Sequence, residues 1–196
     1  MTGQLPLFPL QTVLFPGGRL PLKIFETRYI DLVSRCLRDE APFGVCLIRR
    51  GTESGIAAEF FPIGTSARIV EWGQRADGLL GITIQGERRF RVLTSSVDSS
   101  QKIQAEVEWC EELPAAAPLT DHELGRLREL LLRASDSMAL PYAIRNAKLE
   151  DPNWLSFRLA ELLPDPGLRQ ALLQMNSGQE RLAHLRTLLV ATGTAA

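Results

Sequence analysis

The sequence predicts an α+β fold in which a β-rich N-terminal half precedes a helical C-terminal half. From residue 43 to residue 110 apolar and polar residues alternate with a period of two, which is typical of half-buried strands. After the stretch 111–119, which is rich in proline and alanine, the apolar period becomes 3.6, as in amphipathic helices. The predicted organisation is a β-rich lobe at 1–112, a linker at 113–119 and a helical lobe at 120–192.

The N-terminal stretch LPLFPLQTVLFPGGRLPLKIFETRY is apolar, but its prolines and its Gly-Gly pair interrupt every hydrophobic run. It therefore fits neither an export signal nor a membrane span, because each needs an uninterrupted apolar segment. We expect a strand at 5–10, a turn at 15–18 and a second strand at 20–25. Because Pro6 and Pro9 cannot donate to a ladder, the first strand is predicted to lie at a sheet edge or to be short.

One helix is predicted within the β-rich half, in ETRYIDLVSRCLRDE, where the apolar residues share a helical face. The charged residues expected to face solvent are Arg28, Asp31, Arg35 and Asp39. The segments LLGITIQG and KIQAEVEWC alternate apolar and polar residues and are predicted strands. Turns are expected at 51–55, at 77–78 and at Gly86.

Four helix starts are marked in the C-terminal half. Two are capping boxes and two are Asp-Pro pairs, in which aspartate is the N-cap and proline the first helical residue. They are Thr120-x-x-Glu123, Asp151-Pro152, Asp165-Pro166 and Ser177-x-x-Glu180. Because helices of this length are marginal alone in water, we expect them to pack on one another or on the β-rich half.

The charge is evenly distributed, with a net value of −1. Residues 1–110 hold 13 Lys and Arg against 12 Asp and Glu, and residues 111–196 hold 9 against 11. Neither half is basic, so composition does not favour a dedicated nucleic-acid binder. The three cysteines show no C-x-x-C spacing, which fits a reducing compartment, and we expect a cytoplasmic protein.

The sequence lacks the common motifs of catalytic sites. It contains neither G-x-x-x-x-G-K-[ST] nor G-x-G-x-x-G, and it has no G-x-S-x-G elbow. His122 and His184 stand alone, without the spacing of zinc ligands. We therefore predict no cofactor, no metal ion and no enzymatic activity; a small hydrolase with a site assembled from distant residues is an alternative.

Three features could bind a partner, although each also fits ordinary packing or an outward-facing strand. Arginine outnumbers lysine 19 to 3 and suits planar recognition of carboxylate or phosphate. Two consecutive phenylalanines point to opposite faces of a strand, and a tryptophan at the edge of an element can line a pocket. The candidate binding residues are Arg49, Arg50, Phe60, Phe61, Trp72, Arg88, Arg89, Arg91 and Trp154.

Several segments together resemble the N-terminal domain of Lon proteases. The opening is similar to that family's L-P-L-F/L-P-L segment, V-x-F-P-G turn and P-L-x-I-F-E-x-R-Y stretch. FFPIGTSARIVEW and DGLLGITIQGERRFRV resemble its G-T-x-A-x-I strand, D-G hairpin and G-x-x-R-F-x-V strand. LPDPGLRQALLQMNSGQERLAHLRTLL resembles its P-x-x-x-x-Q-x-L-L run and E-R-L-x-x-L helix. The order and spacing of these motifs match over nearly the whole chain.

The resemblance implies a PUA-like, six-stranded β pseudo-barrel carrying one helix, followed by a C-terminal helical bundle. It also implies recognition without catalysis, because the family's ATPase and protease act in separate modules; the sequence ends at LLVATGTAA, where the ATPase module would begin. We predict binding of unfolded polypeptide or a protein partner, with a protease or chaperone acting in trans as a further partner, and no membrane partner. The alternative is RNA binding, since other PUA-like folds bind structured RNA, although the balanced charge disfavours nucleic acid.

Overall fold

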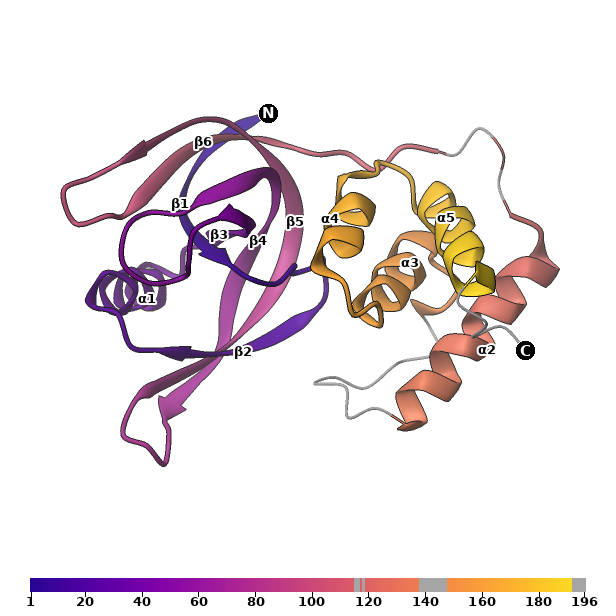
Figure 1. The fold of residues 1–196 in the computed structure, drawn as a ribbon, viewed down its shortest axis with the longest axis horizontal. Coiled ribbons are helices and arrows are strands. Elements are labelled where there is room, and N and C mark those ends of the chain that lie inside the picture. Colours follow the sequence, from indigo (N-terminus) through magenta and orange to yellow (C-terminus); the bar gives the residue numbers. More distant parts are fainter. Residues whose placement is uncertain (115–116, 118, 138–147, 192–196) are drawn as a thin grey trace. The chain divides into compact units, whose positions relative to one another are not determined.

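The computed structural model describes residues 1–114, 117, 119–137 and 148–191, so parts of the predicted linker and helical lobe lie outside the described residues. The chain divides into two compact units, Met1–Cys110 and Glu111–Ala196. The first contains β1 (Thr2–Leu10), β2 (Arg19–Ile24), α1 (Thr27–Asp39), β3 (Phe43–Arg50), β4 (Glu59–Gln74), β5 (Leu80–Val97) and β6 (Ile103–Trp109) (Figure 1). The second contains α2 (Asp121–Ser137), α3 (Pro152–Glu161), α4 (Pro166–Gln174) and α5 (Gly178–Ala191). The predicted α+β class is confirmed.

The six strands form one mixed sheet that closes on itself. Its order is β2-β5-β4-β3-β1-β6, and β5 also pairs with β6. Residues 80–85 of β5 pair with β2 and residues 90–97 pair with β6, both on the side away from β4. β1 and β3 are parallel, whereas the other pairs are antiparallel. The long strand β5 thus belongs to the ring and also carries β2 along its first half.

β1 is an internal strand, so the predicted sheet edge at 5–10 is wrong. Its residues 2–7 pair with β6, and its residues 7–10 pair with β3. Pro6 therefore has a partner strand on one side and Pro9 on the other. Each proline has one side without a partner strand. If the proline nitrogen, which has no hydrogen to donate, faces that side, β1 can contain both prolines without losing a ladder hydrogen bond.

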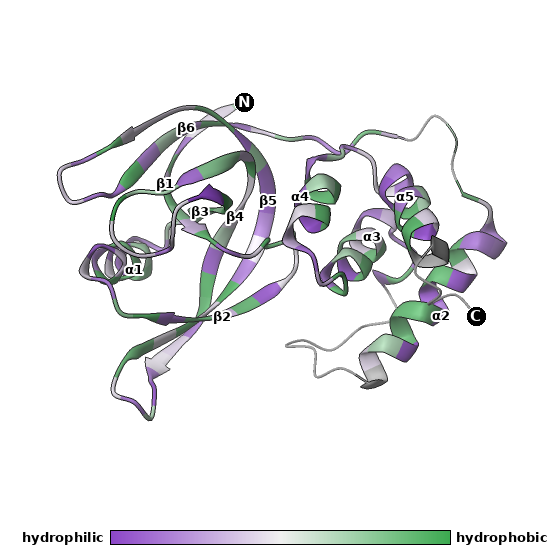
Figure 2. Cartoon of the chain, in the orientation of Figure 1, coloured by the Kyte–Doolittle hydropathy of each residue, from purple (hydrophilic) through white to green (hydrophobic). Residues whose placement is uncertain are grey.

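Alternating apolar residues from these strands form two core clusters. One packs beneath α1 and includes Phe8, whose ring stacks on Tyr29 with centroids 3.9 Å apart, together with Val33 and Ile84. The other includes Leu7 of β1, Phe90 of β5 and the apolar residues of β6. The alternation of hydrophobic and hydrophilic residues along β6 is visible in Figure 2. Both clusters follow the period of two that the sequence shows.

Gly86 lies within β5 and not at the predicted turn. Its N–H donates to the Gly18 carbonyl at 2.9 Å, and its carbonyl accepts from the Gly17 N–H at 2.8 Å. A Cβ at residue 86 would overlap the Phe15 carbonyl oxygen and lie 3.0 Å from the carbon of that group. The glycine is therefore needed for the close approach of the 15–18 turn to the sheet, and this contact is not visible in the local sequence pattern.

Arg28 is also placed differently from the prediction, since its side chain is buried and does not face solvent. Its guanidinium donates to the Gln101 carbonyl at 3.0 Å and to the Glu53 carbonyl at 3.0 Å, and it pairs with the Glu26 carboxylate at 3.2 Å. Glu53 and Gln101 belong to the β3–β4 and β5–β6 connections, which therefore reach the start of α1, whereas Glu26 is the N-cap residue of α1 itself. A helical periodicity cannot reveal contacts with these connections, because they involve residues distant in sequence.

The buried phenol of Tyr29, beside Arg28, should make the stability of this core depend on pH. Burial raises the pKa of Tyr29 to about 12, whereas the phenol of an unfolded chain ionises near 10.0. The raised pKa contributes stability that is fully present below pH 10 and is lost as the pH rises toward 12. We expect Tyr29→Phe to remove this loss, which amounts to at most about 2 to 3 kcal/mol. Urea unfolding of both proteins on either side of this window measures it, and equal alkaline losses would contradict the prediction.

The helix starts of the second unit confirm the predicted caps. The Asp151 carboxylate accepts from the Asn153 N–H at 2.9 Å, and the Asp165 carboxylate accepts from the Gly167 N–H at 2.7 Å. In the first capping box, Glu123 accepts from the Thr120 N–H at 2.9 Å and donates its own N–H to the Thr120 hydroxyl at 3.4 Å. In the second, the Glu180 N–H donates to the Ser177 hydroxyl at 3.5 Å.

Candidate functional site

The predicted arginines do not form one surface. Arg49, Arg50, Arg88 and Arg91 are exposed, whereas Arg89 is only 2% exposed and therefore cannot contribute to an outward-facing cluster. Arg49 pairs with Glu59 across β3 and β4 at 3.0 Å. The guanidinium of Arg88 lies 4.7 Å from the centroid of the Trp109 ring. Arg49 and Arg50 are consecutive in β3, and Arg88 and Arg89 are consecutive in β5, so the members of each pair point to opposite faces of the sheet.

The predicted aromatic residues differ strongly in exposure. Phe60 is half-buried and packs against the core cluster of Phe90, and Phe61 is also half-buried. Trp154 is half-buried in the second unit, with the Arg158 guanidinium 5.8 Å from its ring centroid. Trp72 is 67% exposed, near the end of β4. Of the four, Trp72 alone presents most of its side chain to solvent.

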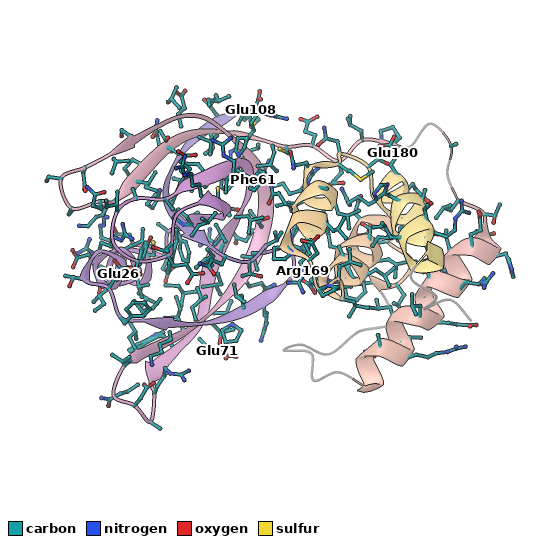
Figure 3. All side chains as sticks on the ribbon, in the orientation of Figure 1. Glu26, Phe61, Glu71, Glu108, Arg169 and Glu180 are labelled. Atoms are coloured by element: carbon teal, nitrogen blue, oxygen red, sulfur yellow. The ribbon has the colours of Figure 1, made fainter. Side chains whose placement is uncertain are left out.

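Trp72 lies on an open strand edge. The ladder between β3 and β4 ends at Ala67, whereas β4 continues to pair with β5 as far as Gln74. Among the described residues no strand pairs with the other side of residues 68–74, which we call the β4 edge. Figure 1 shows this part of the β4–β5 hairpin extending from the ring, and Glu71, labelled in Figure 3, marks its position. Backbone donors and acceptors on such an edge can pair with another extended chain.

The other open edge is less suited to pairing. Within the described part of the chain β2 pairs with β5 only, and Pro21 lies in the middle of β2. A proline in an edge strand removes a donor and is a common protection against strand addition. The β4 edge, with sequence RIVEWGQ, contains no proline. This contrast favours the β4 edge as the site where a partner strand could add.

An apolar sheet face adjoins the β4 edge. The register places Leu22, Ile82 and Trp72 in one cross-strand row, and Leu20, Ile84 and Ile69 in the next. Cross-strand partners have their side chains on the same face of a sheet. Ile82 and Ile84 are buried in the core, whereas the outer members of both rows are partly buried or exposed. The apolar core therefore continues to the surface at Trp72.

The charges beside the β4 edge are paired within the first unit. Arg68 pairs with Glu87 at 2.6 Å, and Arg19 lies 3.6 Å from Glu71. Lys23 and Arg75 both approach Asp77, at 3.0 and 3.5 Å. The edge thus offers unpaired backbone groups and an indole, and the four bases and three acids beside it leave an excess of one positive charge. The indole and the backbone groups fit an extended, apolar polypeptide segment. The sequence identifies Trp72 as a candidate but does not predict the open edge. The sequence feature that could have indicated this edge is the proline-free run around Trp72.

Possible metal ligands and two of the cysteines bear on catalysis in the described residues. No group of three or more His, Cys, Asp or Glu side chains that could hold a metal ion occurs among them. Burial raises the pKa of the Cys36 thiol and of the Cys46 thiol, which disfavours the reactive thiolate. Over the same residues, no helix has the length and the hydrophobicity that a membrane span requires.

The fold and the open edge define the class of protein: a closed mixed sheet carrying one helix, joined in sequence to a helical unit. The family model for the ATP-dependent protease La (LON) substrate-binding domain matches residues 4–191. The chain therefore belongs to the Lon substrate-binding domain family.

Solved structures with the same fold support this assignment. The Lon N-terminal domain protein from Xanthomonas campestris is 37% identical, with a TM-score of 0.75 over 94% of this chain and 98% of that one. The N-terminal domain of the Mycobacterium avium complex Lon protease has a TM-score of 0.63 at 22% identity, covering 93% of this chain and 96% of its own. The second likeness concerns the fold alone.

Curated relatives are Lon proteases of much greater length. The Lon protease of Anaeromyxobacter dehalogenans (strain 2CP-C) is 36% identical over 110 residues, which is 55% of this chain and 13% of the relative. The Lon protease of Escherichia coli (strain K12) is 25% identical over 200 residues, covering 95% of this chain and 24% of the relative. The chain thus spans less than a quarter of the length of these two relatives.

Proposed function

We propose that this chain is a non-catalytic recognition module that binds extended apolar segments of polypeptide substrates at the β4 edge. The observation that carries the proposal is the 67% exposure of Trp72 on an open, proline-free strand edge. Membership of the Lon substrate-binding domain family supports a polypeptide ligand. The buried thiols of Cys36 and Cys46, whose pKa is raised by burial, support binding without chemistry.

The proposed mode of binding is strand addition. A segment of an unfolded substrate lies alongside residues 68–74 and supplies hydrogen-bond partners to the backbone of β4. Its apolar side chains cover Trp72 and the rim of the apolar face, where Leu22 and Ile69 are only partly buried. Main-chain hydrogen bonds do not depend on the ligand's side chains, so this mode suits substrates of many sequences that share an exposed apolar stretch.

The Trp72→Ala variant tests the proposal. Because an exposed indole that becomes buried on binding is a typical hot spot, we expect this change to weaken binding by about tenfold or more. The measurement is fluorescence anisotropy of a labelled, permanently unfolded polypeptide, titrated with the 196-residue protein. The thermal unfolding of the variant should match that of the wild type, since the indole is mostly exposed in the folded state.

Ile56→Ala is the matched control, because Ile56 is 82% exposed but lies in the β3–β4 connection. Equal weakening by both substitutions would place binding elsewhere or make it non-specific. Cleavage of the labelled polypeptide during the titration would contradict the non-catalytic part of the proposal. The dispersed arginines do not favour RNA binding, which stays an alternative prediction.

A further inference from the structure

A pocket in the first unit lies between α1, β1 and β6. It encloses about 230 Å³, below the range of pockets that hold drug-sized ligands, so it suits a smaller group. Its lining residues are Gln4, Leu5, Pro6, Leu32, Arg35, Cys36, Asp39, Ala41, Pro42 and Gln104. Leu5, Leu32 and Cys36 are buried and form an apolar part of the wall, whereas Gln4 and Arg35 are exposed.

The helix positions four of these residues. Leu32, Arg35, Cys36 and Asp39 follow the spacing i, i+3, i+4, i+7 and therefore lie on one face of α1. A second, more open hollow is also lined by residues of α1 and shares Arg35 with the pocket. The remaining residues of this hollow are Asp31, Ser34, Arg38 and Lys102.

Arg35 carries the surplus charge of this region. Arg38 pairs with Asp39 at 2.8 Å, and Lys102 pairs with Asp31 at 3.1 Å. Within the described part of the chain, the structure gives the Arg35 guanidinium no hydrogen bond. The Asp39 carboxylate lies near both Arg38, whose hydrogen bond is the main cause of its lowered pKa, and Arg35, whose charge lowers that pKa further. Two acids therefore face three bases, and the excess is one positive charge at the rim of the pocket. This balance is complementary to a single negative charge.

We propose that the pocket binds a carboxylate attached to a short apolar group. The Arg35 fork holds the carboxylate in the bidentate geometry that guanidinium favours. The side-chain amides of Gln4 and Gln104 are within the lining and supply further donors. Leu5, Leu32 and Pro42 contact the apolar group. The Cys36 thiol is neutral at neutral pH because burial raises its pKa. Asp39 is the acidic residue of the lining, and its carboxylate is paired with Arg38 at 2.8 Å.

Such a ligand has two sources, the C-terminal residue of a polypeptide or a free small carboxylic acid. The pocket is lined by different residues from the β4 edge, so its test is independent of the proposed function. The probes are N-acetyl-leucine, its uncharged amide, and an apolar hexapeptide ending in leucine with a free or an amidated C-terminus. Titrations of the 196-residue protein are followed by the amide NMR shifts of residues 4, 35 and 104.

We expect both acids to bind. Both amides should bind at least about tenfold more weakly, because they lose the charged hydrogen bond. Arg35→Gln should lower the affinity for the acids by a similar factor, whereas Arg50→Gln, at an exposed arginine outside the lining, should leave it unchanged. Tighter binding of the hexapeptide acid supports a polypeptide C-terminus, and equal binding supports a free acid. Equal affinity for acid and amide, or an unaffected Arg35→Gln protein, overturns the proposal.

Discussion

The Arg181→Met variant is expected to lose about 3 to 5 kcal/mol of unfolding free energy, because it leaves several acceptors without their donor, each buried one at a cost of about 1 to 3 kcal/mol. The Arg181 side chain is fully buried and pairs with Glu112 at 2.8 Å. Its guanidinium also donates to the Ser156 hydroxyl at 2.9 Å, the Asn153 amide oxygen at 3.0 Å and the Met175 carbonyl at 2.6 Å. Methionine fills similar space but leaves these acceptors without their donor.

Arg186→Met provides the matched control on the same helix. Arg186 also pairs with an acid, Glu123, but its side chain is 44% exposed. An exposed ion pair contributes about 0 to 1 kcal/mol, so this variant should unfold almost as the wild type does. Urea unfolding followed by helical circular dichroism measures both. Similar midpoints for the two variants would show that the buried network around Arg181 adds little to stability.

The Arg181 network explains why one motif carried information about the fold. The resemblance to the Lon family included an E-R-L-x-x-L helix, which here is Glu180 to Leu185. The arginine of this motif joins α5 to α3 through Ser156 and Asn153, and its guanidinium lies 4.0 Å from the Phe157 ring centroid. Similarly, the R-Y of the opening motif supplies the buried Arg28 and Tyr29. The motif residues hold the fold together, so they predict the fold well.

Local patterns predicted elements because each element is determined by nearby residues. The period of two in KIQAEVEWC became β6, with Ile103, Ala105 and Val107 buried. The Asp-Pro pairs became N-caps in the predicted positions, because a cap depends on three or four consecutive residues. The α+β class and the order of strands and helices followed from such signals and from the family resemblance.

Features that depend on distant residues were not predictable in this way. The prolines of β1 predict a sheet edge or a short strand, because prolines disfavour central strands. The change of partner of β1 from β6 to β3 cannot be derived from its own sequence. The candidate site illustrates the same limit. Trp72 is one of nine candidate residues in the sequence, but its significance comes from the end of the β3–β4 ladder at Ala67, which only the assembled sheet reveals.

Gly86→Ala is expected to destabilise the first unit by about 3 kcal/mol, at the upper end of the usual cost of overpacking. The added methyl group would overlap the Phe15 carbonyl oxygen, and the Thr65 methyl carbon lies 3.1 Å from the same position. Because the obstacle is a backbone atom, no side-chain rotation can relieve the overlap. The 15–18 turn must move away, which breaks its two hydrogen bonds with Gly86.

Amide hydrogen exchange at Gly17 and Gly86 measures this effect locally, and urea unfolding measures it globally. The matched control is Gly125→Ala, because a Cβ at Gly125 in α2 meets no described atom within 4 Å beyond its own helix backbone. Replacing an unobstructed glycine inside a helix should add about 0.5 to 1 kcal/mol of stability, the opposite sign. Protection of Gly17 and Gly86 that survives the substitution at residue 86 would show that the turn can shift without cost. The contact between the turn and Gly86 would then not explain why the V-x-F-P-G turn and the G-x-x-R-F-x-V strand occur together.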